Sequence, residues 1–348
     1  MTMTNGDTEQ DARAAEVTEF PFAAVTVQAT GIHPSTGRLV AVDVLTFNED
    51  GEIGEEFHAV LNPGGDPGPH HYHGLTHEEV AEGQRFSQVL RALDRLLDDR
   101  TLVVHNAPQV WGFLVSEARR AMNAAARSNR SRGRGRGRGR RRRQRVGHVP
   151  KPAAIVDTLA SARRQQVRLE DTRLGTLALA LSVDADPPTA TVERARRPEH
   201  ETTREDNDLL IDVFFAVRDN GALSSVSPDE LRADRFGLQR SQVRVDAMEA
   251  PRPHPNPGHH VPGKKLARGM EVVVAPEVEV DPDELIEAAL KAELVYSEKL
   301  TRTTSLVVCN QSDDLRGKAM HAKRKGIPLL TDAEFLDAVS RVRDRGGR

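Results

Sequence analysis

The sequence predicts an α/β protein with a mixed sheet in its N-terminal part and a second, smaller α/β domain at its C-terminal end. Three consecutive apolar segments, at 23–28, 39–47 and 53–61, precede an alternation of helical and strand patterns, which is typical of a mixed α/β sheet. A polar, proline-rich stretch at 220–257 then separates this part from further apolar segments. The length of 348 residues suits two domains of ordinary size.

The elements of the N-terminal part follow from local patterns. Residues 1–18 are polar and are expected to be disordered. The segments at 30–37 and 48–51 fit turns between consecutive strands. Apolar residues recur at spacings of three and four over 86–97, which predicts an amphipathic helix. The remaining predicted elements are strands at 101–104 and 154–157 and helices at 112–126, 174–181 and 200–217.

The C-terminal part has its own start and stop signals. Asp281 and Pro282 open a helix with proline in its first turn, and Gly326 ends another at 314–325. Strands are predicted at 271–275, 304–308 and 327–330, and a capping box at 331–334 opens the last helix. The predicted domains are 19–219, with an Arg/Gly-rich insertion at 127–150, and 258–343, joined by a linker at 220–257.

A basic segment interrupts the first domain. The chain has a formal net charge of −3, yet 11 arginines and no acid lie between residues 127 and 145. Alternating glycine and arginine cannot bury apolar surface, so we expect a flexible arm that binds phosphates without reading bases. A solvated insertion without a function is the alternative. The candidate nucleic-acid-binding residues are Arg132, Arg134, Arg136, Arg138, Arg140, Arg141, Arg142 and Arg143.

The composition of the chain excludes several other classes of protein. The single cysteine, Cys309, excludes a disulfide framework and a CxxC metal site. The polar, acidic start and the lack of a long apolar run predict no signal peptide and no membrane partner. We therefore expect a cytoplasmic protein, associated with the nucleoid if its source is bacterial. The histidines at 70, 71, 73 and 77 lie in a Pro/Gly loop without a fixed helical spacing, which favours an exposed polar loop over a metal site.

Several segments occur in the order found in one nuclease family. These are Val-Thr-Val-Gln-Ala-Thr-Gly at 25–31, Gly-Leu-Thr at 74–76, His-Asn-Ala-Pro at 105–108, Val-Asp-Thr-Leu at 156–159, Leu-Gly-Thr-Leu at 174–177, and His200 with Glu205. On these residues, 19–219 resemble the DnaQ-like (DEDDh, DNA polymerase III epsilon-type) 3′→5′ exonucleases. The resemblance implies a ribonuclease-H-like exonuclease fold with a mixed sheet.

The resemblance also implies a site with two divalent cations on four carboxylates and a histidine that helps to activate water. Here Thr26 and Gln28 stand at the first two carboxylate positions, and Val110 stands at the third. Only His200 and Glu205 remain of the expected set. Because hard cations require anionic oxygen ligands, we expect a degenerate, non-catalytic site without a cofactor. Mg²⁺ or Mn²⁺ would be needed only if the domain were active.

The C-terminal segment 258–343 resembles a BRCT module, through Gly-Lys at 263–264, Thr-Thr-Ser-Leu-Val-Val at 303–308 and the run at 317–335. This resemblance implies a domain that docks a protein partner. Lys318 matches the lysine of the family's phosphate pocket, whereas Ala275 and Pro276 stand where the family has a Ser or Thr.

Three functions are compatible with these patterns. The favoured one is a non-catalytic DNA replication or repair factor that binds nucleic acid through its arm and a protein through its C-terminal domain. The first alternative is an active 3′→5′ exonuclease of proofreading or repair. The second is an RNA-binding protein dominated by its Arg/Gly arm. DNA is preferred over RNA as the partner.

Overall fold

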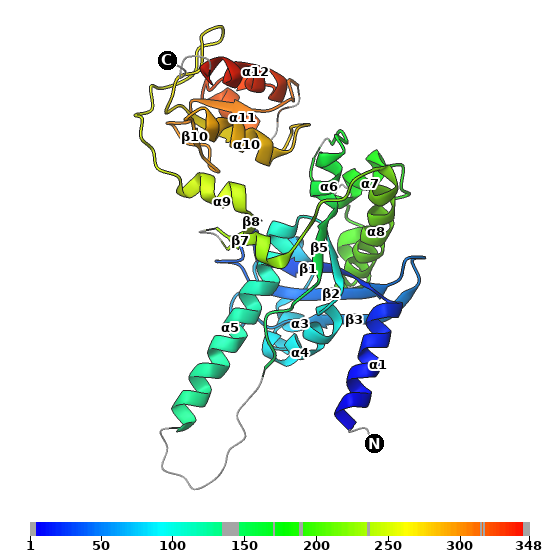
Figure 1. Cartoon of the computed structure of the whole chain (residues 1–348). Coiled ribbons are helices and arrows are strands. Elements are labelled where there is room, and N and C mark those ends of the chain that lie inside the picture. Colours follow the sequence, from blue (N-terminus) through cyan, green and yellow to red (C-terminus); the bar gives the residue numbers. More distant parts are fainter. Residues whose placement is uncertain are drawn as a thin grey trace.

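The computed structural model describes residues 5–133, 146–169, 171–187, 191–234, 237–313, 315 and 317–343. These residues form two α/β units, one around a six-stranded sheet and one around a four-stranded sheet (Figure 1). The predicted α/β class with a mixed sheet is confirmed.

The six-stranded sheet has the order β3-β2-β1-β4-β5-β6. Strands β1, β2 and β3 are antiparallel, β1, β4 and β5 are parallel, and β6 is antiparallel to β5. Their bounds are β1 Phe22–Ala29, β2 Leu39–Phe47, β3 Ile53–Val60, β4 Thr101–Val104, β5 Ala154–Asp157 and β6 Ser225–Val226.

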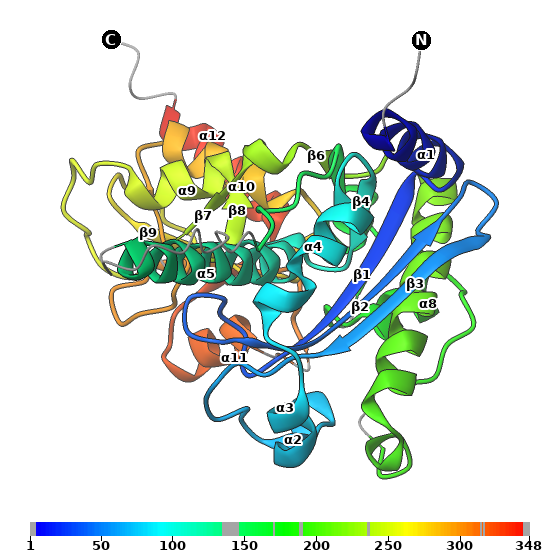
Figure 2. The same cartoon turned by 90° about the horizontal axis from the view of Figure 1, so that it is seen from below.

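Helices cover both faces of this sheet, with α8 on one side and α4 and α5 on the other (Figure 2). Because side chains alternate along a strand, Ala24 of β1 packs against α8, whereas Ala23 and Val25 pack against α4 and α5. The helices of this unit are α1 Asn5–Glu19, α2 His70–His73, α3 His77–Glu82, α4 Phe86–Leu97, α5 Ala107–Gly133, α6 Thr158–Arg164, α7 Leu174–Ala180 and α8 Glu199–Asn220.

The N-terminal segment differs from its prediction, because helix α1 covers most of residues 1–18, which were expected to be disordered. Its anchor is an ion pair of 2.7 Å between Glu16 and the fully buried guanidinium group of Arg100. Arg100 also donates to the carbonyl oxygen of Phe20. The order of this helix therefore depends on contacts with residues that are distant in the sequence, which local composition does not reveal.

The segment predicted to be a linker, 220–257, also contains regular structure. Strand β6 joins the first sheet, β7 Leu231–Ala233 and β8 Gln239–Ser241 form a hairpin, and α9 Gln242–Glu249 follows. The hairpin approaches α5 closely, since a Cβ atom on Gly112 would lie 2.9 Å from the carbonyl oxygen of Gly237. In turn, Val243 and Ala247 of α9 pack into the core of the C-terminal unit. The two units are therefore connected by packed segments.

The C-terminal sheet is entirely parallel, with the order β10-β9-β11-β12. Helices α10 and α12 share one core cluster with one face of this sheet, and α11 covers the other face. The elements are β9 Glu271–Val274, α10 Pro282–Lys291, β10 Val295–Tyr296, β11 Leu306–Val308, α11 Gly317–Arg324, β12 Leu329–Leu330 and α12 Asp332–Arg343.

Helix α5 is longer than predicted and carries the base of the Arg/Gly segment. Its distal half extends away from the sheet (Figure 1), and Arg127 and Arg130 are exposed on it. Arg132 lies in its last turn, whereas the candidate arginines at 134, 136, 138 and 140–143 lie outside the described residues. In the part of the chain that the structure describes, every helix is too short or too polar to cross a bilayer.

Candidate functional site

The site begins with a row of polar side chains across three strands. Thr26 of β1 lies opposite Asp43 of β2, and Asp43 lies opposite His58 of β3. Residues that are paired across antiparallel strands project to the same face, and this face is the one that α8 covers. Gln28, two residues after Thr26, points the same way.

Helix α8 meets this row with side chains spaced by one turn. Glu199, Thr203 and Asn207 lie at spacings of four residues, so they share one face of the helix. Thr26 Oγ1 donates to Asn207 Oδ1 at 3.3 Å, and Gln28 Nε2 donates to Thr203 Oγ1 at 3.1 Å. Both β1 positions that the resemblance assigns to carboxylates are therefore engaged by neutral side chains of α8.

These contacts close into a network through the buried carboxylates. Asn207 Nδ2 donates to Asp43 Oδ1 at 2.8 Å, and Thr203 Oγ1 donates to Glu199 Oε1 at 2.6 Å. The ring of His58 lies between the two acids, with Nδ1 at 3.1 Å from Asp43 and Nε2 at 3.2 Å from Glu199. We call this set, which consists of Thr26, Gln28, Asp43, His58, Glu199, Thr203 and Asn207, the β1–α8 network.

Asp43 is neutralised from two sides. Arg204 Nε donates to Asp43 Oδ1 at 3.0 Å and Nη2 donates to Oδ2 at 3.0 Å, in a two-pronged contact. Burial alone would raise the pKa of Asp43, but hydrogen bonds from His58, Arg204 and Asn207 lower it below its usual value. Burial also opposes a charge on His58, yet Asp43 and Glu199 outweigh burial and raise its pKa to about 9. The buried charges are thus compensated by side chains of the protein itself.

A groove of about 810 Å³ runs beside the network. Its lining includes Thr26, Gln28, Val110 and Glu205, so the structure brings four of the five site positions that the resemblance implies to one depression. It does not bring their functional groups together. Val110 belongs to the apolar core, and Glu205 pairs with Arg197 at 2.5 Å. His200 is exposed, with its ring centroid 6.3 Å from that of His58.

The charges of the groove are predominantly acidic. Its described lining carries six carboxylates, on Asp184, Asp186, Glu205, Asp206, Asp208 and Asp212, and three guanidinium groups, on Arg173, Arg194 and Arg197. The arginines face acids: Arg194 lies 2.7 Å from Asp206, and Arg197 binds Glu205 and lowers its pKa. A phosphodiester backbone would therefore meet net repulsion in this groove.

The loop before α5 has a structural role. Asn106 adopts a left-handed conformation with φ of 68°, and its backbone N–H donates to Asp157 Oδ1. Asp157 Oδ2 accepts from Ala107, and the same side chain caps α6. His105 contacts Thr158 Oγ1 and the carbonyl oxygen of Thr172, and burial lowers its pKa. These side chains stabilise the turn and the N-terminal ends of α5 and α6.

The donor set does not fit the pair of divalent cations that the fold family implies. Mg²⁺ and Mn²⁺ prefer carboxylate oxygens, but the side chains facing each other across β1 and α8 are hydroxyls and amides that already bind one another. Of the two buried carboxylates beside them, Asp43 already accepts from Arg204, His58 and Asn207, and Glu199 accepts from Thr203 and lies 3.2 Å from His58. Within the described ranges, no three His, Cys, Asp or Glu side chains are grouped as a metal site.

The histidines at 70–73 also have structural contacts that account for them. His73 is buried, with Nε2 at 3.0 Å from the carbonyl oxygen of Pro67, and its Nδ1 accepts from the backbone N–H of Leu75. Burial lowers the pKa of His73. The rings of His71 and Tyr72 contact each other in a tilted arrangement at a centroid distance of 4.7 Å, and Tyr72 is 67% exposed. The segment predicted to be an exposed loop thus forms the short helix α2, and His70, His71 and His73 line the groove.

In the C-terminal unit, the phosphate-pocket candidate Lys318 has an internal partner. Its Nζ atom lies 3.4 Å from Glu298 Oε1, and Arg240 Nη2 lies 3.3 Å from the same oxygen. The Tyr296 hydroxyl and Arg244 also approach Glu298. Burial would raise the pKa of Glu298, but these cations outweigh it and hold the pKa at about 2. A carboxylate of the protein thus occupies the centre of this basic cluster.

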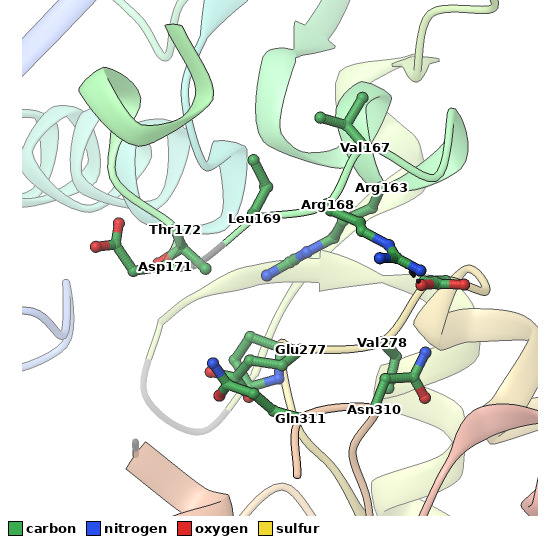
Figure 3. A pocket seen from close by; sticks show the side chains of 12 residues that line it. Arg163, Val167, Arg168, Leu169, Asp171, Thr172, Glu277, Val278, Asn310 and Gln311 are labelled. Atoms are coloured by element: carbon green, nitrogen blue, oxygen red, sulfur yellow. Dashed lines mark ion pairs between the residues drawn. The ribbon is translucent and has the colours of Figure 1, made fainter. Parts of the chain in front are cut away.

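A second cavity, of about 300 Å³, lies between the two units (Figure 3). Residues after α6 form one side, and the loops after β9 and β11 form the other. Arg168 Nε lies 3.5 Å from Glu279 Oε1 across the boundary, and Figure 3 shows the Arg163 guanidinium group pointing into the space between Leu169 and Glu277. An ion pair therefore crosses between the units at this cavity.

Most residues of the β1–α8 network were not predicted from the sequence. Asp43, His58, Glu199, Thr203 and Asn207 were not among the candidate residues. The available signal was the spacing of Glu199, Thr203 and Asn207 by four on a helix, together with polar side chains at Thr26 and Gln28 in an otherwise apolar strand.

Comparison with known proteins adds one family. A family model described as "Exonuclease" matches residues 29–186. The match begins directly after Gln28 and ends before Glu199, so it contains neither Thr26 and Gln28 of β1 nor helix α8. No curated protein matches the chain. The first unit is therefore similar to exonucleases over most of its length outside these two segments.

Solved structures with a similar fold include two kinds of nuclease. Exonuclease I matches with 14% identity and a TM-score of 0.39, over 57% of this chain and 40% of that chain. The RNase domain of the yeast Pop2 protein matches with 14% identity and a TM-score of 0.38, over 61% of this chain and 81% of that chain. This chain thus spans less than half of the exonuclease I chain it matches.

Proposed function

We propose that the protein is a non-catalytic, nucleic-acid-associated factor of the replication or repair type, built on a DnaQ-like exonuclease fold. One observation carries the proposal: Thr26 and Gln28 bind Asn207 and Thr203 directly, at positions where the resemblance requires metal-binding carboxylates. Losing these charges removes the ligands that two-metal phosphodiester hydrolysis needs.

Nucleic acid would be bound outside the groove. The acidic lining of the groove opposes a polyanion, whereas the segment at 127–145 carries 11 arginines and no acid. Arg127 and Arg130 are exposed on the part of α5 that extends from the body of the protein. Guanidinium groups match phosphate oxygens, so the arm would bind DNA by charge rather than by base sequence.

The C-terminal unit would dock a protein partner. Its parallel sheet, with α10 and α12 on one face and α11 on the other, supports the resemblance to a BRCT module. The pairing of Lys318 with Glu298 favours a partner that is bound without a phosphate group.

A nuclease assay tests the proposal. The purified full chain is incubated with labelled single-stranded DNA and Mg²⁺ or Mn²⁺, and no products beyond those of a protein-free control are expected. Metal-dependent shortening from the 3′ end that disappears in Glu205→Ala would instead support the active-exonuclease alternative.

A binding measurement with DNA and RNA of equal length tests the proposed preference for DNA and the proposed role of the arm. We expect tighter binding of DNA and a marked loss of affinity when the arm arginines are replaced by glutamine. RNA binding that is unaffected by deletion of both folded units would support the Arg/Gly RNA-binding alternative.

A further inference from the structure

The exposed side of α11 is a basic surface of the C-terminal unit. Ala319 and Ala322 of this helix are fully buried against the sheet, in a cluster with Val307 of β11. On its solvent side His321, Lys323 and Arg324 are exposed, as is Lys325 directly after the helix. We call these four residues the α11 patch. Between Leu315 and Thr331 the sequence contains five Lys and Arg residues and no acid.

Some cations of the same unit pair with acids on their own helix. Lys291 pairs with Glu287 at 3.1 Å, and Arg341 pairs with Asp337 one helical turn away. By contrast, Lys323, Arg324 and Lys325 have no acidic group within ion-pair distance among the described residues. The helix dipole favours cations near this end, but three adjacent cations also repel one another.

We infer that the α11 patch contacts the phosphate backbone of the nucleic acid that the arm binds. This inference rests on the proposed function and adds a second, folded contact to it. Outside the segment at 127–145 the chain carries an excess of acidic residues, so a cluster of unpaired cations on a helix is complementary to a polyanion. The patch contains no aromatic side chain other than the His321 ring, so the contact reads charge and not base sequence.

The position of α11 supports a contact of this kind. It alone among the described helices covers its face of the C-terminal sheet, whereas α10 and α12 lie on the opposite face. Figure 2 shows α11 well separated from α10 and α12. A backbone lying along α11 would therefore not need to displace another helix.

The test measures the salt dependence of DNA affinity for the full chain by fluorescence anisotropy. The variant Lys323→Gln/Arg324→Gln/Lys325→Gln is compared with Lys264→Gln/Lys265→Gln/Arg302→Gln, which changes the net charge equally at other exposed sites. We expect the first variant to reduce the log–log slope by about 0.7–0.9 for each phosphate that is no longer neutralised, so by roughly 2 in all. The second variant should keep the wild-type slope and differ only slightly in affinity.

Several results would overturn the inference. Equal slopes for the α11 variant and the wild type would show that α11 binds no phosphate, and equal decreases in both variants would reduce the effect to net charge. Binding of vesicles with anionic lipids that depends on the α11 patch, together with wild-type DNA binding by the α11 variant, would assign the patch to a membrane. A wild-type chain that binds no nucleic acid would instead refute the proposed function. Equal melting temperatures show that the variants are folded.

Discussion

Thr26 Oγ1 donates a hydrogen bond to Asn207 Oδ1 at 3.3 Å and so links β1 directly to α8. Asn207 also connects α8 to β2, because its Nδ2 group donates to Asp43 at 2.8 Å. A hydroxyl and an amide thus fill the space between the strand and the helix, and the buried carboxylate beyond them is balanced by Arg204 and His58. The arrangement is self-contained and needs no added cation.

Replacing Asn207 by alanine tests how much this link contributes. The substitution removes a donor from buried Asp43 and an acceptor from Thr26, so we expect the free energy of unfolding to fall by about 1–3 kcal/mol. Denaturation in urea, followed by circular dichroism, measures the change. Asn220→Ala, at an exposed hydrogen bond with Gln165, should change it by less than about 0.5 kcal/mol. Similar decreases in both variants would contradict a special role for Asn207.

Restoring carboxylates should create a dependence on metal ions. The combined variant Thr26→Asp, Gln28→Glu, Val110→Asp and Asn207→Asp gathers acids beside Asp43, and their mutual repulsion should lower the melting temperature without metal. Millimolar Mn²⁺ should then raise the melting temperature of the variant but not that of the wild type. Calorimetric titration provides an independent measurement. A wild-type chain that is stabilised by Mn²⁺ to the same extent would contradict the poor fit between these residues and divalent cations.

The pKa of His58 predicts a loss of stability at alkaline pH. The folded pKa of about 9 exceeds the ordinary value of 6.5, so the contribution of His58 is complete below about pH 6.5 and is lost as the pH rises towards 9. The expected size is roughly 2–3 kcal/mol. In urea denaturation, wild-type stability should fall over this range, and the fall should be smaller in His58→Gln. Parallel curves for the two proteins would show that His58 is not charged in the folded state.

The first three strands, helix α4 and the order of the later elements could be predicted, because their apolar periodicity is local. Helix α1 could not, since it is fixed by Glu16 pairing with Arg100, which is 84 positions away. The hairpin β7–β8 was equally hidden, because its order depends on a close approach of Gly237 to Gly112 on α5. Segments with few apolar residues are ordered here by contacts that local composition does not encode.

Three positions of the candidate site could be located from the sequence. Thr26, Gln28 and Val110 were found by motif, and all three line the groove. Glu205 was chosen on α8 from the sequence, whereas the structure directs Thr203 and Asn207 towards β1. Which face of a helix meets a sheet is fixed by its buried residues, here Leu210 and Phe214. Glu205 lies only two residues from both Thr203 and Asn207, so a match by motif does not show which of these positions faces the sheet.

The arm should dominate the electrostatic part of nucleic-acid binding. Replacing Arg134, Arg136 and Arg138 by glutamine should reduce the slope of log affinity against log salt by about 0.7–0.9 for each phosphate that the variant no longer neutralises. The measurement is anisotropy at several salt concentrations, with Arg13→Gln, Arg218→Gln and Arg341→Gln as a control of equal charge at sites that form ion pairs. Unchanged slopes in the arm variant would show that the folded units carry the binding.

The charge of Glu298 should determine whether Lys318 can bind an added anion. Removing its charge by Glu298→Gln leaves Arg240, Arg244 and Lys318 without their shared carboxylate. Arg240 and Arg244 keep Asp234 and Asp283 as partners, but Lys318 loses its acidic partner in a mostly buried cluster. The free energy of unfolding should therefore fall by about 3 kcal/mol.

An added anion should partly replace the missing carboxylate. Inorganic phosphate should therefore raise the melting temperature of Glu298→Gln more than chloride does at equal ionic strength, because phosphate can bind the freed cations. The wild type should not distinguish the two salts, since Glu298 already occupies the cluster. Glu287→Gln, which breaks an exposed pair with Lys291, is the matched control and should lose less than about 0.5 kcal/mol. If phosphate stabilised the wild type as strongly as the variant, Lys318 would be open to phosphate despite Glu298, and the phosphate-independent docking proposed for this unit would be wrong.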